Sequence, residues 1–474
     1  MKKTQRTPLP RRLHITPLAL VKQRFLLAVV AALVFWSAAL PRVEAKRRRR
    51  ARSKAARTSK KTLKGRKLPP RAAVFESMEK ELQRNKGKLK LKDEVNPYFM
   101  GVSVKHHKVW YASASLGTLL FRTKSSGRSL SATVRVGSYK QDNTGYYGIY
   151  PRAQSATIPI EPNDLALRRA LYFSLDRAYK YALRGHSRKK AYLRSHPRKD
   201  LPPAWTKVRP VSHDNTGHAV TIVPDRWVDT IKKASAVFRK HPLIQSSSVT
   251  VSRSESGEYL LTSEGLRYYS SAGLAGFVIA ASALAEDGMN LRVSWKTQLT
   301  SADSAPAQDE IVKAAQKVAT RLEALLKAPK MKENYSGPVL FQGSAAAAFV
   351  TATLARSLSA NAMPVSWSKK GVFEGMKSRP ILPDWVSIVD DPSKKRLRGK
   401  ELAGHYEVDH EGVKAKKVEL VKRGRLTGFL SSRRPTKDSK ESNGHGRGLF
   451  GMLSSVAMPS NFIVRARRGL SKKG

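Results

Sequence analysis

The sequence contains no cysteine among its 474 residues. It therefore has no disulfide, no thiolate ligand for a metal and no cysteine nucleophile. The absence agrees with an oxidising compartment, where a stray thiol is a hazard, although many cytoplasmic proteins also lack cysteine.

Several motifs of hydrolytic and nucleotide-binding sites are also missing. The chain has no strand-borne G-x-S-x-G elbow, no glycine-rich phosphate loop with its lysine, and no histidine pair at helical spacing with a glutamate beside it. None of the eleven histidines lies between His241 and His405. A hydrolase needs either a nucleophile with its base or a metal with at least three protein ligands, so these absences restrict the possible chemistry.

Acidic residues are scarce: 35 Asp and Glu stand against 90 Lys and Arg, which gives a formal net charge of +55. The run Lys46–Lys67 holds 13 basic residues and no acidic ones, which leaves +42 on the rest of the chain. We expect residues 46–70 to form a disordered basic arm. It would bind anionic lipid or acidic polysaccharide, or serve as a solvated linker without a partner; nucleic acid is not expected if the chain is exported.

An apolar run near the N-terminus predicts export. Residues 25–40 read FLLAVVAALVFWSAAL, and only basic charges precede them. This is the layout of a signal peptide, with Pro41 and the small residue Ala45 marking a cleavage site. The alternative is an uncleaved membrane anchor, although a span usually needs about 20 apolar residues. We therefore interpret residues 1–45 as a signal peptide or anchor and expect the protein in the periplasm or cell envelope.

From about residue 71 onward the pattern is globular, and its length predicts two domains, 71–330 and 331–474. In the first, apolar spacing predicts helices over 72–84, 164–193, 225–240 and 309–327. Alternation predicts strands over 98–104, 108–116 and 130–137, and further strands within 247–295 that are separated by turns at Ser256-Gly257, Glu264-Gly265 and Asp287-Gly288.

The second domain is predicted to be mostly β with one inserted helix. Strands are expected over 337–341, 385–389, 416–421, 425–431 and 461–464, and an alanine-rich helix over 344–358. The fold class is therefore α+β, with N-terminal helices packed on a largely antiparallel sheet. This domain is followed in the sequence by a mostly β C-terminal domain with one inserted helix.

The C-terminal third carries a specific resemblance. It contains YSGPVLFQGSAAAAFV from Tyr335, WVSIVDDP from Trp385, VDHEGVKAKKVELVKRGRLTGFLSSR from Val408, SNGHGRG from Ser442 and PSNFIV from Pro459. Upstream lie VRVGSYKQDNT and LRRALYFSLDRAYKYAL. In this order and spacing the motifs resemble the TldD/PmbA family of metallopeptidase-related proteins.

The resemblance implies zinc, but the residues that would bind it are replaced. Active members are similar in a His-Glu-x-x-x-His helix after the Y-x-G-P-V strand, in which two histidines hold zinc and the glutamate activates water. In this sequence Thr351 and Arg356 stand at the histidine positions and Ala352 at the glutamate position. The resemblance also implies a late ligand beyond the PSN segment, whereas this sequence stops at Gly474, so we expect a shortened C-terminal domain that lacks the zinc motif and binds no cofactor.

Other residues could in principle form a metal site. His405, Asp409, His410 and Glu411 cluster in GHYEVDHEG, and His445 lies in SNGHGRG. The resemblance instead makes both segments turn or strand elements that line an interdomain cleft. His213 and His218 in SHDNTGH are weaker candidates for the same reason.

Three functions remain open at this stage. The first is a noncatalytic subunit that binds unfolded or small peptides and pairs with a zinc-bearing TldD-like homologue, as the resemblance implies. The second is an active metallopeptidase. The third is a basic module that binds the cell envelope through Lys46–Lys67.

Overall fold

The computed structural model describes residues 71–145, 154–161, 163–197, 201–216, 224–299, 306–331, 333–360, 371–448 and 455–469. All of them belong to one unit of the chain, Leu68–Gly474. The predicted export signal and basic arm lie outside the described residues. Within the described part, no helix is both long and apolar enough to cross a membrane.

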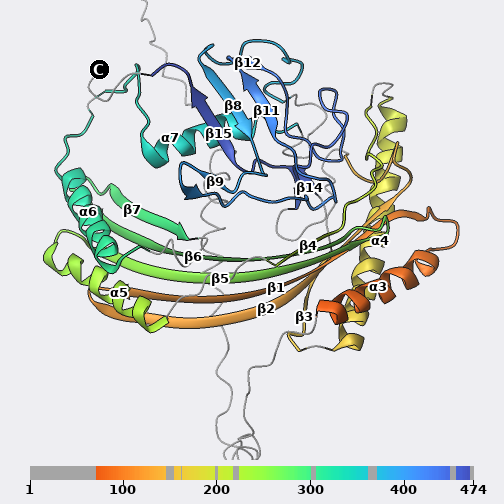
Figure 1. Cartoon of the computed structure of the whole chain (residues 1–474), viewed down its shortest axis with the longest axis horizontal. Helices are drawn as coiled ribbons and strands as arrows, with labels where there is room; N and C mark the ends of the chain where they lie inside the picture. The colour runs from red at the N-terminus through yellow and green to blue at the C-terminus, as the bar shows by residue number, and fades with distance from the viewer. Residues whose placement is uncertain are drawn as a thin grey trace, which may run out of the picture. The chain divides into compact units, whose positions relative to one another are not determined.

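A seven-stranded sheet dominates the N-terminal region (Figure 1). Its strand order is β3-β2-β1-β5-β6-β4, with β7 also paired to β6, and every pair is antiparallel except β4 with β6. The strands are β1 (Pro97–Ser115), β2 (Thr118–Val136), β3 (Gln154–Ile158), β4 (His213–Thr216), β5 (Ser246–Thr262), β6 (Arg267–Leu284) and β7 (Asn290–Leu299).

Two predicted interruptions of these strands are wrong. The expected strands 98–104 and 108–116 form one 19-residue strand, β1, and β5 runs through the expected turn at Ser256-Gly257. Cross-strand pairing explains both, because His106 lies opposite Gly257 and His107 opposite Gly127. Each imidazole ring occupies the space that a Cβ on the opposite glycine would need, so polar residues that suggested a break instead continue the sheet. The turns at Gly265 and Gly288 are confirmed, both with positive φ.

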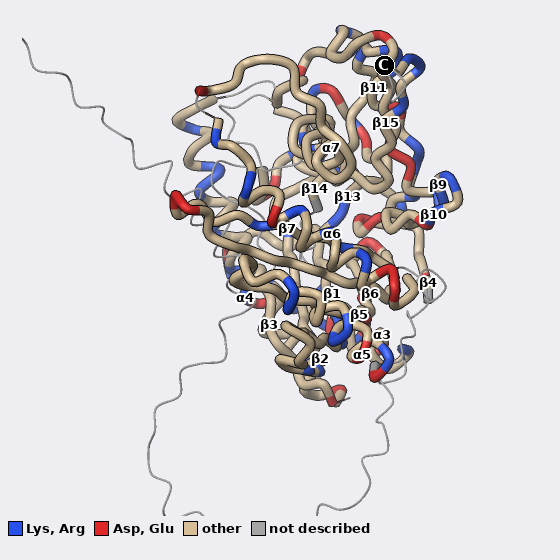
Figure 2. The backbone as a smooth tube through the Cα atoms, turned by 90° about the vertical axis from the view of Figure 1, so that its left-hand side faces the viewer, with Lys and Arg blue, Asp and Glu red and all other residues tan. Residues whose placement is uncertain are grey.

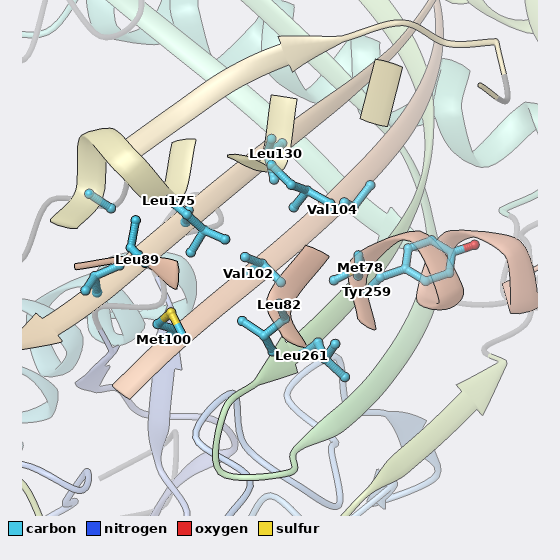
Figure 3. Packing of buried hydrophobic residues seen from close by; sticks show 14 of the residues in the cluster. Met78, Leu82, Leu89, Met100, Val102, Val104, Leu130, Leu175, Tyr259 and Leu261 are labelled. Atoms are coloured by element: carbon cyan, nitrogen blue, oxygen red, sulfur yellow. The ribbon is translucent and has the colours of Figure 1, made fainter. Parts of the chain in front are cut away.

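Helices cover one face of the sheet at its two ends. At one end α3 (Arg71–Lys88) and α4 (Asp164–Ser195) enclose an apolar cluster, in which Met78 and Leu82 of α3 meet Val102 and Val104 of β1 and Leu175 of α4 (Figure 3). At the other end α5 (Pro224–Ala236) and α6 (Gln308–Leu326) cover a second cluster.

The predicted helices of this region are confirmed with small changes at their ends. Asn163 caps α4 by accepting a hydrogen bond from the backbone N of Ala166 at 2.9 Å. The last turn of the predicted helix 225–240 is a 3₁₀ helix, Val237–Lys240. Leu325, which the periodicity placed on the apolar stripe of α6, is 40% exposed because it lies in the last turn of the helix.

The C-terminal region contains a four-stranded sheet in the order β12-β11-β8-β15. Its strands are β8 (Val386–Asp390), β11 (Val418–Lys422), β12 (Arg425–Leu426) and β15 (Phe462–Ala466). Two smaller pairs are β9 (Arg396–Leu397) with β10 (Lys400–Glu401), and β13 (Gly446–Gly448) with β14 (Ser455–Ala457). Leu358, Ile388, Leu420 and Leu426 form its apolar core.

Two strand predictions in this region are wrong. Residues 337–341 form no strand, because no other described segment pairs with their backbone. The expected strand 425–431 is paired as β12 only over its first two residues, after which the chain turns inward. The single helix, α7 (Gly343–Val350), continues as a π-helical turn over Thr351–Ala355. The α+β fold class is confirmed.

Candidate functional site

The helix that the resemblance associates with metal begins without a side-chain cap at Gly343 and contains four consecutive alanines. Alanine loses no side-chain entropy in a helix, so local propensity explains its formation without burial. Thr351 and Thr353 donate their hydroxyls to the carbonyls of Ala347 and Phe349, at 2.7 and 2.8 Å. Such back-bonding accompanies the widening to π-helical geometry at this point.

The three positions aligned with the zinc motif are all exposed. The hydroxyl of Thr351 is already bonded to its own helix, Ala352 has no polar group, and Arg356 carries a positive charge. Zinc takes imidazole, carboxylate or thiolate donors, and a guanidinium repels it. The residues at this position therefore do not fit a zinc ion.

The surrounding stretch is unusually free of charge. Residues 334–355, which we call the neutral segment, contain no charged side chain, and Arg356 is the only one between Glu333 and Lys369. In Figure 2 the tube of α7 is accordingly free of charge colours. No residue from 334 to 353 is buried. Several large side chains are exposed to solvent: Leu340 is 80%, Tyr335 62% and Val339 61% exposed.

His445 and Asp390 are fully buried and form the centre of a polar cluster. The Nε2 of His445 is 3.1 Å from Oδ1 of Asp390, and its Nδ1 is 2.9 Å from Oδ1 of Asn443. Asp390, at the end of β8, also accepts hydrogen bonds from the backbone N and the hydroxyl of Ser460. Both ring nitrogens are therefore engaged, and the cluster ties the SNGHGRG and PSN segments to the C-terminal sheet.

Asp409 and Glu411 form a buried turn rather than a surface ligand pair. Oδ1 of Asp409 accepts hydrogen bonds from the backbone N of Glu411 and of Val413, each at 2.9 Å, and Oδ2 accepts one from Gly446 N at 2.9 Å. Burial, together with the neighbouring Glu411 carboxyl, raises the pKa of Asp409 well above its ordinary value. Gly412 closes the turn with a φ of +77°.

His410 points from this turn toward the large sheet. Its Nδ1 accepts a hydrogen bond from Gly448 N at 2.8 Å, and its Nε2 is 3.8 Å from Oε2 of Glu258 on β5. Burial lowers the pKa of His410 to about 4, so the ring is neutral at pH 7.

The other histidine candidates lie elsewhere. His405 contacts the carbonyl of Pro392 through Nδ1 at 2.9 Å, and His213 is 4.0 Å from Glu407. His218 lies outside the described residues. Across the described ranges, no three His, Cys, Asp or Glu side chains converge in a way that could hold a metal ion.

The sequence analysis missed an arginine that joins the two regions. Arg433 is 1% exposed, and its guanidinium donates two hydrogen bonds to Glu264, at 2.6 and 2.8 Å, and two to the carbonyl of Thr206, at 2.9 and 2.7 Å. Tyr139 donates a further bond to Glu264 at 2.6 Å. The only signal in the sequence was the position of Arg433 in the LSSRR run, which overlaps the end of one of the motifs that carry the resemblance; nothing there identified Glu264 as its partner.

A tryptophan connects this arginine to a second buried ion pair. The indole of Trp205 lies 4.8 Å from the Arg433 guanidinium and 3.7 Å from that of Arg135, which pairs with Asp142 at 2.8 Å. Burial raises the pKa of Asp142, but Arg135 and Lys189 more than offset it, so the net pKa lies below the ordinary value. Asp142 of the VRVGSYKQDNT motif thus forms part of a buried structural ion pair with Arg135.

We call the set Trp205, Glu264, Asp409, His410, Glu411, Arg433 and His445 the buried junction. Beside it lies a cavity of about 390 Å³ lined by Tyr139, Lys207, Val208, Arg209, Pro210 and Glu264. The carboxylate of Glu264 in this cavity is already bonded to Arg433 and Tyr139.

Comparison with known proteins gives a domain match in the C-terminal third. Residues 334–471 match the PmbA/TldA metallopeptidase C-terminal domain. A protein described as a metalloprotease from Methanothermobacter thermautotrophicus is 32% identical over 93 residues, which is 19% of this chain and 19% of that protein. The match therefore spans about a fifth of the length of that relative.

Two solved structures share the fold over most of the chain. A protein described as a modulator of DNA gyrase from Thermotoga maritima aligns with a TM-score of 0.51 over 82% of this chain and 77% of its own, at 13% identity. A protein of the same description from Bacteroides thetaiotaomicron aligns with a TM-score of 0.51 over 84% and 77%, also at 13% identity. Residues 334–471 are therefore similar to the PmbA/TldA metallopeptidase C-terminal domain, and the chain shares its fold with these two solved structures.

Proposed function

We propose that this chain is a noncatalytic member of the TldD/PmbA family that binds extended polypeptide and works with a metal-bearing homologue. The observation that carries the proposal is the composition of the helix from Gly343 to Arg356, which contains no His, Asp, Glu or Cys. Without such donors the helix supplies neither ligands for zinc nor a carboxylate to activate water.

The exposed apolar surface supports a binding role. Val339, Leu340 and Phe341 are 61%, 80% and 43% exposed and adjoin one another in sequence. Contiguous apolar patches of this kind on soluble proteins mark surfaces that another molecule covers. A homologous subunit and a bound polypeptide are the two occupants that the family membership suggests.

The backbone of residues 337–341 supports polypeptide binding in particular. Within the described part of the chain, none of these residues pairs with another strand, although their sequence predicts a strand. An extended peptide can add to such a segment through main-chain hydrogen bonds, with alternate side chains setting the preference.

We further propose that this binding takes place outside the cytoplasm, because residues 25–45 have the layout of an export signal. Fractionation of the native host followed by N-terminal sequencing checks this: the protein should be in the envelope fraction, with residue 46 at its N-terminus if the signal is cleaved. A cytoplasmic chain that begins at residue 1 would contradict it.

Metal analysis and a protease assay test the noncatalytic role. The purified protein should hold far less than one zinc per chain and should not cleave denatured casein. About one zinc per chain with chelator-sensitive cleavage would overturn the proposal.

Co-purification from the native host tests the pairing. The tagged chain should recover a homologue that carries the His-Glu-x-x-x-His motif, and the variant Leu340→Ser/Phe341→Ser should recover much less of it. Recovery of only self-associated chain from both would exclude the pairing.

A further inference from the structure

Arg356 stands alone at the end of a neutral, exposed surface. It is the only charged residue between Glu333 and Lys369, although 26% of the residues in the whole chain are charged. Its side chain is exposed, and within the described part of the chain its guanidinium has no hydrogen bond or ion pair. Five N–H donors in a planar fork are therefore available to a ligand.

Two stacked aromatic rings are exposed on, and just before, the helical stretch that leads to Arg356. The rings of Phe341 and Phe349 stack at 4.6 Å with an interplanar angle of 15°, and they are 43% and 48% exposed. Phe349, Thr353 and Arg356 follow one another at steps of four and three residues along α7 and the π-helical turn that continues it. The bond from Thr353 Oγ1 to Phe349 O shows that these two residues are neighbours on this stretch.

The length of this stretch limits what it can bind. Arg356 lies seven positions after Phe349; seven residues would rise about 10 Å in an α-helix, and the π-helical turn between the two shortens this distance. An extended peptide advances about 3.3 Å per residue, so at most about three residues fit between the aromatic rings and the guanidinium. A carboxylate accepts two parallel hydrogen bonds from one guanidinium, which suits the free end of a polypeptide.

On the face of the large sheet turned toward the C-terminal region, exposed Arg292 and Lys296 of β7 lie opposite Ser282 and Val278 of β6. This face is identified by Glu258 and Tyr268, which approach His410. The same face of the four central strands presents a group of uncharged side chains: Val109, Tyr111, Phe121, Thr123, Ser125, Ser252, Ser254, Leu274 and Val278. Figures 1 and 2 both place α7 on this side of the sheet.

We propose that the exposed surface from Phe349 on α7 to Arg356, which follows the π-helical turn, binds the C-terminal residues of an uncharged, extended polypeptide, with Arg356 pairing the terminal carboxylate. This inference rests on the proposed peptide-binding function and adds a preference for ligands with a free C-terminal carboxylate. The positive side chain that excludes zinc thus becomes the group that selects a free C-terminus.

Calorimetry with the full chain and synthetic peptides tests the proposal. The probe is an N-acetylated decapeptide of Ala, Ser, Val and Leu with a free carboxylate, compared with the same peptide amidated at its C-terminus. A charge-assisted pair that becomes covered on binding predicts about tenfold tighter binding of the acid form. Equal affinity of the two forms, within about twofold, would refute the carboxylate contact while leaving peptide binding in place.

Variants locate the contact. Arg356→Gln should remove the preference for the free acid, and Arg356→Lys should keep part of it, because a lysine retains the charge but not the fork. Arg226→Gln on α5 is the matched control, since it removes an equally exposed arginine and the same net charge; it should keep the full preference. A preference that survives in Arg356→Gln would exclude this residue.

Two further outcomes distinguish a failure of the C-terminus selection from a failure of the proposed peptide-binding function. If neither peptide form binds, the peptide-binding function itself fails. A third peptide, amidated but with an internal Asp, distinguishes a terminal carboxylate from any acidic side chain: binding as tight as that of the free acid would refute the selection of a C-terminus. The comparison of free acid with amide needs only the wild-type protein, so it stands even if a variant fails to fold.

Discussion

The buried junction and the neutral segment reverse the usual placement of side chains. In the junction, Arg433 and His445 are 1% and 0% exposed and Asp409 is fully buried, and each has hydrogen-bond partners. In the neutral segment, Val339 and Leu340 are exposed and have no charged neighbour in the sequence. Charge is thus buried where the two regions of the chain meet, and apolar surface is exposed on and before α7.

The contrast assigns different roles to the two places. A buried ion is stable only with partners that compensate for its desolvation, so the ionisable residues of the junction serve structure. Covering an exposed apolar surface removes it from water and lowers the free energy. The neutral segment is therefore the place where we expect binding to occur. Most of the histidines and acidic residues that the sequence offered as metal ligands thus lie in the buried junction, and the candidate binding surface is the neutral segment.

The largest effect should come from removing the junction arginine. Arg433→Met leaves Glu264, whose side chain is 10% exposed, without its cation, and leaves the carbonyl of Thr206 without its donors. Breaking one side of a buried pair costs about 3 to 5 kcal/mol. Urea unfolding should show a loss of this size.

The double variant Arg433→Met/Glu264→Gln is the control for that result. Because it removes the uncompensated charge, it should recover part of the lost stability. A single variant as stable as the wild type would show that the junction does not hold the two regions together, and the contrast with the neutral segment would disappear.

The next effect depends on pH and arises from His410. Its pKa is lowered to about 4 in the folded protein and is near 6.5 in the unfolded chain. Between these values the unfolded state binds more protons, so stability is lost as the pH falls from 6.5 toward 4 and is regained as it rises. Taken alone, this group would remove up to about 3 kcal/mol at pH 4.

His410→Asn isolates this contribution. The amide oxygen can take the place of Nδ1 in accepting the Gly448 N–H, but the side chain does not titrate. Denaturant unfolding at several pH values should give equal stabilities for variant and wild type at pH 7.5, and a shallower decline for the variant below pH 6.5. Parallel curves would mean that His410 is not held neutral by burial.

A smaller effect should distinguish the junction from an ordinary apolar core. Trp205 lies against two guanidinium groups, whereas Trp227 stacks on Phe277 at 4.7 Å inside an apolar cluster. Trp205→Phe and Trp227→Phe remove the same atoms, but only the first weakens cation–π contacts. Thermal unfolding should show Trp205→Phe to be the more destabilising by about 1 kcal/mol, and equal losses would argue against the cationic contribution.

The sequence predicted the elements of this fold better than their continuity or pairing. Helix periodicity and the Asn163 cap located α4 to within two residues at its end, because both signals are local. The uninterrupted β1 was not predictable, since it depends on Gly257 and Gly127 lying opposite His106 and His107 on other strands. The absence of metal donors in α7 was readable directly, but the link between Arg433 and Glu264 joins residues 169 positions apart and has no local signal.

The smallest effect on stability is expected in the neutral segment, and it completes the comparison. Leu340→Ser and Phe349→Ser change side chains that are 80% and 48% exposed, so each should alter the free energy of unfolding by no more than about 0.5 kcal/mol. The same two substitutions should weaken binding of the uncharged decapeptide severalfold, because they remove apolar area that the ligand would cover. Calorimetry and urea unfolding on the same preparations give both quantities. A loss of stability without a loss of binding would place the neutral segment among the structural parts of the chain, together with the junction.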